Sequence, residues 1–257
     1  MKFLRISFPV LMVIISFSSC RTVSRVPVEL VGITGSKIEM NTEWDVNPDP
    51  EAVAVLDTYK SRIDRIMTEV IGESEMGMIS RKPESLLSNL ITDVLRESTV
   101  PYIGKPADMA LMNMGGLRTS LNKGTITTGN IYEILPFENH LCILTLKGSD
   151  LVKLMENIAF ARGEGVSNVK LEITEDGKLS SAFIGGEPID VDRMYTVATI
   201  DYLSEGNDKM TALLLAQSKQ CYEKATIRDI FLSYIRKQTA EGKKIGAEID
   251  NRITVKP

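Results

Sequence analysis

The pattern of apolar and polar residues divides the chain into three parts. A largely apolar run, residues 6–17, follows two basic residues near the N-terminus. Residues 28–40 alternate loosely and are rich in Val and Ile, which predicts one strand within an arm that spans 21–48. From residue 49 to residue 257 helical and strand patterns follow one another, which predicts one large domain.

Two amphipathic helices are predicted at the start of this domain. Asp49 is expected to cap the first helix and Pro50 to begin it, with the helix running as far as Gly72. Its apolar residues recur at steps of three and four: Val53, Leu56, Tyr59, Ile63, Ile66 and Val70. The second helix is expected from about Pro83, with one apolar face built from leucines, isoleucine and valine up to residue 95.

Short strands and helices are predicted in clusters over the rest of the domain. Strands are expected at 108–112, 141–146, 169–174, 178–184, 195–200 and 253–255, and helices at 128–135, 149–161 and 226–239. Asp176-Gly177 suits the tight turn of a hairpin between two of these strands. Because the strands and helices do not alternate strictly, the predicted fold class is α+β, with mixed β-sheets packed with helices.

Residues 1–19 have the pattern of a signal peptide of the lipoprotein type. The apolar run has about 12 residues, whereas a helix that spans a bilayer needs roughly 20. Ser18 and Ser19 precede Cys20, and small residues at these positions fit a processing site that leaves Cys20 lipidated at the mature N-terminus. The alternative is a cleaved secretory peptide with an incidental cysteine. Both interpretations predict an exported protein, and the first predicts a membrane-anchored lipoprotein that faces the periplasm or the cell exterior.

The net charge and the cysteine spacing argue against a nucleic-acid-binding site, a zinc site and a disulfide framework. Loss of residues 1–19 removes Lys2 and Arg5, which leaves 28 of the 30 basic residues against 34 acidic ones and a net charge of −6. An acidic surplus argues against nucleic acid as a partner. Cys142 and Cys221 have no CxxC or Cys/His spacing, so neither a zinc site nor a disulfide framework is predicted. Buried thiols are expected, and one disulfide remains open.

His140 is the only histidine of the chain. A two-metal phosphoesterase needs several His and Asp ligands, and a Ser or Cys nucleophile usually needs a His base. The sequence also has no HExxH, Walker or strand-following GxGxxG motif. We therefore predict no catalytic residue, no metal ligand and no cofactor in this chain. Hydrolysis by paired carboxylates stays open, but no spacing selects a pair.

Several loop residues suit a ligand that is both anionic and aromatic. Gly115 and Gly116 follow an apolar strand and allow a ligand to approach the backbone, while Arg118 offers a planar fork to phosphate or ribose oxygens. Arg81 precedes the second helix, whose first amides also favour an anion. An aromatic ring, Phe137, follows a proline in another loop. Tyr202 lies in a third loop, so the two rings are candidates for a clamp on a flat base.

Six segments, in this order, resemble motifs of the C-terminal domain of the 5′-nucleotidase and UDP-sugar hydrolase family. They are residues 81–93, 113–118, 125–127, 134–139, 202–208 and 251–253. The resemblance covers roughly residue 49 to the C-terminus. It implies an α+β domain that binds the nucleoside part of the substrate, while a separate N-terminal metallophosphoesterase domain carries two divalent metals.

The resemblance also implies roles for individual residues. Phe137 and Tyr202 would stack on the base, and Arg81 and Arg118 would contact phosphate or ribose oxygens. Asp208 would accept hydrogen bonds from ribose hydroxyls, and the remaining polar contacts to the nucleoside would come from Asn113 and Asn139.

The sequence departs from the family pattern at several of these loops. Tyr202 stands where Phe is usual, and the usual Gly-Gly-Asp-Gly-Tyr/Phe is replaced by Gly206-Asn-Asp-Lys-Met210, which alters the ribose side of the expected pocket. Glu138 and Met114 each replace a glycine, and Glu138 adds a negative charge. The catalytic domain of the family has no counterpart in this sequence.

The expected function is therefore recognition of a nucleotide or nucleoside as one subunit of a 5′-nucleotidase-type phosphohydrolase in nucleotide catabolism. A separate di-metal phosphoesterase chain would supply both divalent metals. The alternatives are a non-enzymatic nucleotide-binding lipoprotein and a vestigial structural or interaction lipoprotein. The expected partners are the nucleotide or nucleoside, the metallophosphoesterase chain and, through the lipid anchor, a membrane.

Overall fold

The structure is a computed structural model that describes residues 34–39 and 41–256. The predicted signal peptide and Cys20 lie outside the described residues. Most of the strand predicted at 28–40 does too, and its described part, 34–39, contains no strand. The chain divides into two compact units at Val53 and Ala54. In the first unit, a short 3-10 helix, η1 (Thr42–Val46), begins after Asn41, whose side chain accepts the backbone N–H of Glu43 at 3.0 Å.

Helix α2 (Pro50–Met67) confirms the predicted start of the first helix and corrects its end. The side chain of Asp49 accepts the backbone N–H groups of Glu51 at 2.9 Å and Ala52 at 3.3 Å. The helix stops at Met67 rather than at Gly72, because the next residues form strand β1 (Val70–Ser74). This strand pairs antiparallel with β3 (Gly124–Thr127), a contact that no local pattern contains. No described residue of α2 is buried.

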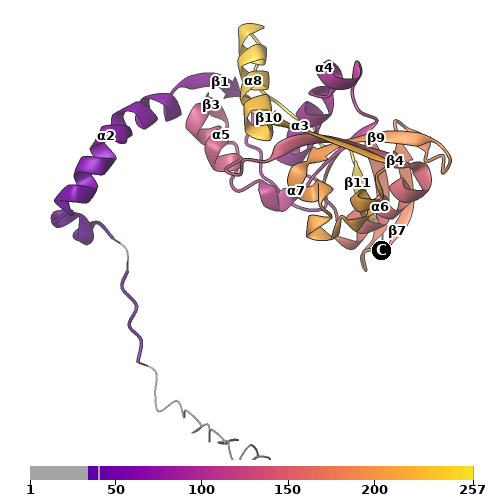
Figure 1. The fold of residues 1–257 in the computed structure, drawn as a ribbon, viewed down its shortest axis with the longest axis horizontal. Coiled ribbons are helices and arrows are strands. Elements are labelled where there is room, and N and C mark those ends of the chain that lie inside the picture. Colours follow the sequence, from indigo (N-terminus) through magenta and orange to yellow (C-terminus); the bar gives the residue numbers. More distant parts are fainter. Residues whose placement is uncertain (1–33, 40, 257) are drawn as a thin grey trace, which may run out of the picture. The chain divides into compact units, whose positions relative to one another are not determined.

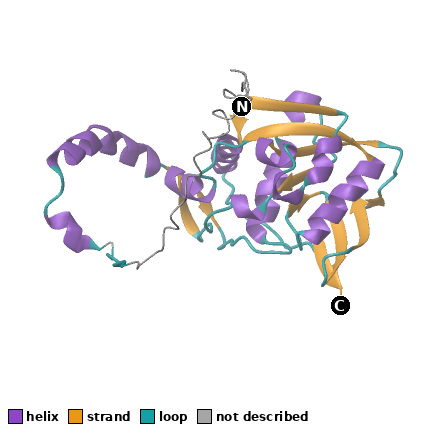
Figure 2. Ribbon diagram, turned by 60° about the horizontal axis from the view of Figure 1, so that its bottom comes forward, coloured by secondary structure: helices purple, strands orange, loops and turns teal. Residues whose placement is uncertain are grey.

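The strands of the described residues form three sheets (Figures 1 and 2). The first joins β1 and β3. The second has the order β10 (Ser218–Thr226), β4 (His140–Lys147), β9 (Met194–Ile200), β2 (Met109–Met112) and β5 (Gly165–Ser167). The third has the order β11 (Ile253–Lys256), β6 (Val169–Thr174), β7 (Leu179–Ile184) and β8 (Glu187–Pro188). Two pairs, β2 with β9 and β11 with β6, are parallel and the others antiparallel. The predicted α+β class with mixed sheets is confirmed.

Helices cover these sheets and form the core with them. Helix α3 (Leu86–Glu97) packs on β2, β5 and α8 (Ile227–Ala240), and α8 also contacts β1 and α5 (Thr128–Ile134). Helix α6 (Gly148–Phe160) packs against β6 and β7. Among the largest fully buried side chains are Leu87, Met109, Leu111, Ile126, Ile131 and Phe231. Each such side chain contributes about 1.5–3 kcal/mol through its removal from water.

Short elements complete the described part of the chain. They are α4 (Val100–Ile103), α7 (Asp201–Ser204) and the 3-10 helices η2 (Met114–Gly116), η3 (Asn207–Lys209) and η4 (Thr211–Leu215). Helix α3 begins at Leu86, after the predicted Pro83, because Ser85 and Ser88 form a reciprocal capping box. Among the described residues, no helix combines the length and apolar content that crossing a membrane requires.

Cys142 and Cys221 form a disulfide, so the expectation of two buried thiols was wrong. The two residues lie directly opposite each other in the antiparallel pair of β4 and β10. They are 79 residues apart in sequence, and only the pairing of these two strands brings them together. The bond ties the edge strand β10 to the sheet that carries the site described next.

Candidate functional site

A cavity of about 400 Å³ collects five of the seven predicted site residues. Its lining consists of Asn113, Gly115, Gly116, Phe137, Asn139, Tyr202 and Asp208. Arg118 lies beside it, with its guanidinium carbon 6.0 Å from the centroid of the Phe137 ring and Nη1 donating to the carbonyl of Gly115 at 3.1 Å. Arg81 is exposed and does not line this cavity.

The central sheet brings these residues together. The carboxyl ends of the parallel strands β2 and β9 meet at one edge, so Asn113 after β2 and Tyr202 after β9 emerge side by side. Strand β4 runs antiparallel to β9 with Leu141 opposite Ile200, and the residues before β4 therefore reach the same edge. The predicted segments become one site only through this strand order.

His140 and Asp201 form the last side-chain contact between β4 and β9 before the two loops diverge. His140 Nδ1 lies 3.1 Å from one carboxylate oxygen of Asp201, and the other oxygen accepts the backbone N–H of Tyr202 at 2.8 Å. The backbone carbonyl of Asn139 accepts the N–H of Ile227 at 2.9 Å. His140 therefore links the segment before β4 to the segment after β9, next to the lining residues Asn139 and Tyr202.

Asp208 is the centre of a small hydrogen-bond network. Asn113 Nδ2 donates to one of its oxygens at 2.6 Å, and the Tyr202 hydroxyl donates to the other at 2.9 Å. The hydrogen bond to Asp208 raises the pKa of the Tyr202 hydroxyl above its ordinary value, and lost hydration and the carboxylate charge act in the same direction. Asn207, which replaces a glycine of the family pattern, donates its Nδ2 to the carbonyl of Tyr202 at 2.8 Å.

The other amide atom of Asn113 has no partner. The residue is only 6% exposed, and its Oδ1 accepts no hydrogen bond from any described residue. A Cβ atom on Gly116 would lie 3.0 Å from this oxygen, so the glycine leaves room beside it. A buried acceptor without a donor costs about 1–3 kcal/mol. Among the described residues, this oxygen is therefore the buried side-chain acceptor that the fold leaves without a donor.

The two rings of the cavity are unusually open to solvent for aromatic residues. Phe137 is 50% exposed and Tyr202 41% exposed, and the two rings make no contact with each other. Glu138, between two lining residues, is exposed and does not itself line the cavity. The cavity thus offers two aromatic surfaces from separate loops.

Glu164 supports the site, and no sequence pattern identified it. This carboxylate is buried at 5% exposure, accepts the backbone N–H of Met114 at 2.6 Å and pairs with the ammonium of Lys82 at 2.6 Å. It thereby fixes the loop that carries Asn113 and the glycines. Across the described residues, no group of three or more His, Cys, Asp or Glu side chains is arranged to hold a metal ion.

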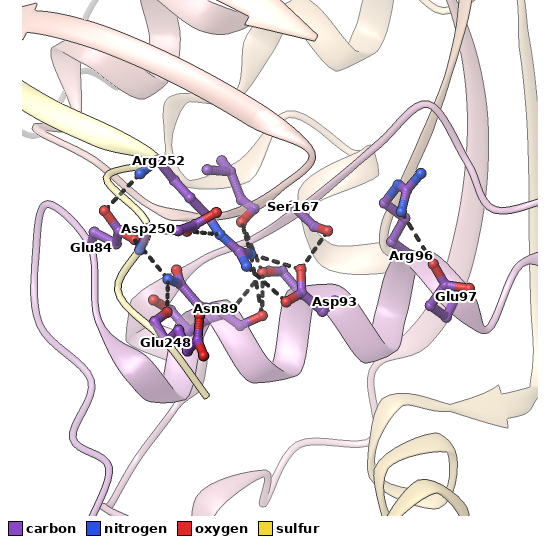
Figure 3. Close-up of polar contacts among 12 residues, drawn as sticks. Glu84, Asn89, Asp93, Arg96, Glu97, Ser167, Glu248, Asp250 and Arg252 are labelled. Carbon is purple, nitrogen blue, oxygen red and sulfur yellow. Dashed lines mark hydrogen bonds and ion pairs between the residues drawn. The ribbon is translucent and has the colours of Figure 1, made fainter. Parts of the chain in front are cut away.

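The first and last motifs of the sequence form a different cluster, around Arg252 (Figure 3). The Arg252 guanidinium donates to both oxygens of Asp93 at 2.7 Å, to Asp250 at 2.8 Å and to the backbone carbonyl of Val166 at 2.8 Å. Burial lowers the pKa of Arg252, but the hydrogen bonds to the two carboxylates outweigh burial and hold the pKa above its ordinary value.

Glu84 belongs to the same cluster. One of its oxygens accepts the side-chain amide of Asn89 at 2.7 Å, and the other accepts the backbone N–H of Arg252 at 2.8 Å. These contacts fasten the segment before β11 to the start of α3, as Figure 3 shows. None of these residues lines the cavity at Asn113.

Comparisons with known proteins match more than half of this chain to a known family of domains. The model of the 5′-nucleotidase C-terminal domain matches residues 70–214. A cell wall protein of Listeria monocytogenes, Lmo0130, is 28% identical over 270 residues, which is 92% of this chain and 34% of that protein. The endonuclease YhcR of Bacillus subtilis is 33% identical over 184 residues, which is 68% of this chain and 14% of that protein.

Solved structures give the same result. The 5′-nucleotidase precursor of Thermus thermophilus superposes with a TM-score of 0.68 at 28% identity, over 80% of this chain and 44% of that one. The NAD nucleotidase of Haemophilus influenzae, at 19% identity and a TM-score of 0.60, shares the fold. The chain thus spans about a third or less of the two relatives named above and under half of these two structures.

Proposed function

Because the chain belongs to the 5′-nucleotidase C-terminal domain family, we propose that it recognises the nucleoside part of nucleotides for a 5′-nucleotidase-type phosphohydrolase. The cavity between Phe137 and Tyr202 is the observation that carries the proposal. It combines two exposed rings, a carboxylate and a buried amide oxygen that lacks a donor. A nucleoside supplies a flat base, vicinal hydroxyls and hydrogen-bond donors, and so matches all three.

In this proposal the base stacks between Phe137 and Tyr202, which contributes about 1–3 kcal/mol for a stacked base. Asp208 keeps lone pairs for ribose hydroxyls in addition to its two present donors. The unpartnered Oδ1 of Asn113 accepts from the nucleoside, and Asn139 makes a further polar contact. Arg118, next to the Phe137 ring, attracts the phosphate, and the exposed Arg81 does so at longer range.

We propose that a separate di-metal phosphoesterase chain performs the hydrolysis. Metal-bound hydroxide is the usual nucleophile of such reactions, and its ligands are mostly histidine and carboxylate. The relatives and solved structures named above are more than twice as long as the part this chain matches. This chain contains a single histidine, which is engaged with Asp201.

The proposed location is outside the cytoplasm, with the protein held to a membrane by a lipid on Cys20. The segment 1–19 and the small residues before Cys20 support this location. The similarity over 92% of this chain to a cell wall protein supports export independently of the signal peptide.

The test combines calorimetric titration and phosphate release on the protein from Arg21 onward. AMP, UMP and UDP-glucose are titrated, and the same compounds are incubated with the protein and Mn²⁺, Mg²⁺ or Zn²⁺. We expect binding without release of phosphate. Turnover that chelation abolishes would contradict the assignment of catalysis to another chain. The absence of any binding would contradict nucleotide recognition itself.

Two substitutions locate the binding site within the same experiment. Phe137→Ala removes one stacking surface and is expected to weaken AMP binding about 10- to 100-fold, since stacking of a base contributes roughly 1–3 kcal/mol. Arg118→Ala is expected to weaken AMP more than adenosine, because only AMP carries the phosphate. Tyr102→Ala is the matched control, an exposed ring that stacks on Tyr222 and does not line the cavity. Equal losses in the control and in Phe137→Ala would contradict the assigned site.

A further inference from the structure

A second cavity, of about 480 Å³, adjoins the first. The two share Gly115 and Asp208, and the second is also lined by Lys82, Phe160, Ala161, Glu164 and Lys209. Asp208 therefore stands between two spaces. A ligand that contacts this carboxylate from the first cavity would therefore lie next to the second.

Two lysines and two carboxylates line the second cavity, and only one of the lysines forms an ion pair with a described residue. Lys82 and Glu164 neutralise each other through a contact of 2.6 Å. Asp208 already receives the Tyr202 hydroxyl and the Asn113 amide. Lys209 forms no hydrogen bond or ion pair with any described residue, and its ammonium lies 4.7 Å from the centroid of the Phe160 ring. That ring is 60% exposed, so the ammonium rests over a surface that is open to solvent.

The backbone at Lys209 is unfavourable for a lysine. Asp208 and Lys209 both have left-handed torsions, with φ of 51° and 67°. A residue with a side chain pays about 1–2 kcal/mol for this conformation, and glycine pays almost nothing. Glycine at position 209 would therefore relieve this strain.

We infer that the second cavity is a subsite for a phosphoryl group carried on the ribose 2′ or 3′ oxygen of the bound nucleoside, with Lys209 as its cationic partner. The inference rests on the proposed function, from which it takes the approach of the ribose hydroxyls to Asp208. A substituent on one of these oxygens extends past Asp208 into the space lined by Lys209. The flexible stem of the lysine lets its ammonium leave the Phe160 ring for a phosphate oxygen.

The subsite distinguishes ligands by the position of their phosphate. A 2′- or 3′-phosphate gains a charge-assisted hydrogen bond from Lys209. A 5′-phosphate lies on the other side of the sugar, so its contribution to binding does not depend on Lys209. The gain from Lys209 is expected to shrink as salt concentration rises, because the cavity is open to solvent.

The experiment titrates adenosine, adenosine 3′-phosphate and AMP into the protein from Arg21 onward and into two variants. The unmodified protein should bind adenosine 3′-phosphate about tenfold more tightly than adenosine, as expected for a hydrogen bond to a charged group. Lys209→Gly should lose this gain and keep the affinity for adenosine. Its thermal midpoint should not fall, because glycine relieves the left-handed strain. The control, Lys178→Met, removes an exposed lysine of the hairpin at Asp176 and should change none of the affinities.

The outcomes separate this inference from the proposed function. If adenosine binds and its 3′-phosphate binds no more tightly, the subsite is refuted and nucleoside recognition stands. If the gain persists in Lys209→Gly, the assignment of Lys209 is refuted. If adenosine does not bind at all, nucleoside recognition fails and the subsite fails with it.

Discussion

Two polar clusters of this domain, both built from motif residues, differ in how completely their hydrogen bonds are satisfied. Around Arg252, the guanidinium meets two carboxylates and backbone carbonyls, and the side chain of Asn89 donates to Glu84 at 2.7 Å and to the carbonyl of Glu248 at 2.9 Å (Figure 3). At the cavity, Asn113 keeps an acceptor without a donor. The difference indicates a role in stability for the first cluster and agrees with the ligand binding proposed above for the second.

The comparison also shows that charge alone does not identify a binding residue. Arg252 has a fork that would suit phosphate, but it is only 9% exposed and its donors are already used inside the domain. The guanidinium of Arg118 makes one hydrogen bond, to the Gly115 carbonyl, and remains exposed beside a cavity. Free hydrogen-bonding capacity next to an accessible space distinguishes the two arginines.

The largest effect is expected from Arg252→Ala. Removal of the buried guanidinium leaves Asp93 without its cation and Asp250 with Lys170 alone, and it breaks the charge-assisted hydrogen bonds to both carboxylates. Because the two carboxylates are about half exposed, we expect a loss of about 3 kcal/mol in the free energy of unfolding, below the full cost of breaking a buried ion pair. Nucleoside affinity, measured well below the unfolding midpoint, should be unchanged. Urea unfolding and calorimetry test both parts. A variant of wild-type stability with weakened nucleoside binding would reverse the assignment of the two clusters.

A pair of asparagine substitutions sharpens the contrast at smaller magnitude. Asn89→Ala removes a side chain whose two amide hydrogens are donated inside the domain, so we expect a loss of about 1–3 kcal/mol in stability and no change in nucleoside affinity. Asn113→Ala removes an oxygen that has no partner in the free protein and also removes the Nδ2 donor to Asp208, so relief of the unpaired acceptor and loss of that hydrogen bond largely offset each other. We expect a stability change under about 1 kcal/mol and an affinity loss of roughly tenfold. If both variants changed stability and nucleoside affinity to the same extent, the number of satisfied hydrogen bonds would not distinguish the two clusters.

The smallest effect is expected in the pH dependence of stability, through the carboxyl of Asp250. Burial raises the pKa of Asp250, but hydrogen bonds from Arg252 and Lys170 outweigh burial and hold the pKa below its ordinary value. A carboxyl with a lowered folded pKa stabilises the protein above its unfolded pKa, near 3.9, and this contribution disappears as pH falls through the folded value. Asp250→Asn should therefore be less stable than wild type at pH 7, by under about 1 kcal/mol because the carboxylate is half exposed. Unfolding midpoints of the two proteins should converge below about pH 4.

Much of the fold could be predicted from local patterns. The strand at Val169–Thr174, the hairpin turn at Asp176-Gly177 and the helix that ends before Pro136 all follow from alternation or from turn chemistry, and the structure confirms them. Strands β3, β5 and β10 were not predicted. Two of them are very short, and β10 is an edge strand of largely polar residues with no alternating apolar face.

The errors share a physical cause, which is dependence on distant contacts. The first helix was extended into β1 because the apolar spacing continues there, while pairing with β3 decides the structure. The disulfide depends on the neighbouring positions of β4 and β10. Of the site residues implied by the family resemblance, all except Arg81 and Arg118 line one cavity. Only the order of the strands shows that the rings of Phe137 and Tyr202 reach the same cavity. Their contacts with a nucleotide stay a prediction.

The antiparallel register of β4 and β9 also has a consequence for how this domain can diversify. The loops with Phe137 and Tyr202 adjoin the neighbouring strands β4 and β9. Main-chain hydrogen bonds hold these strands about 4.8 Å apart and so set the distance between the points where the two loops begin. Side chains in the loops can be exchanged one at a time without a change in this distance. Point substitutions in the loops can therefore change the ligand that a related domain binds, while the sheet keeps the spacing between the loops constant.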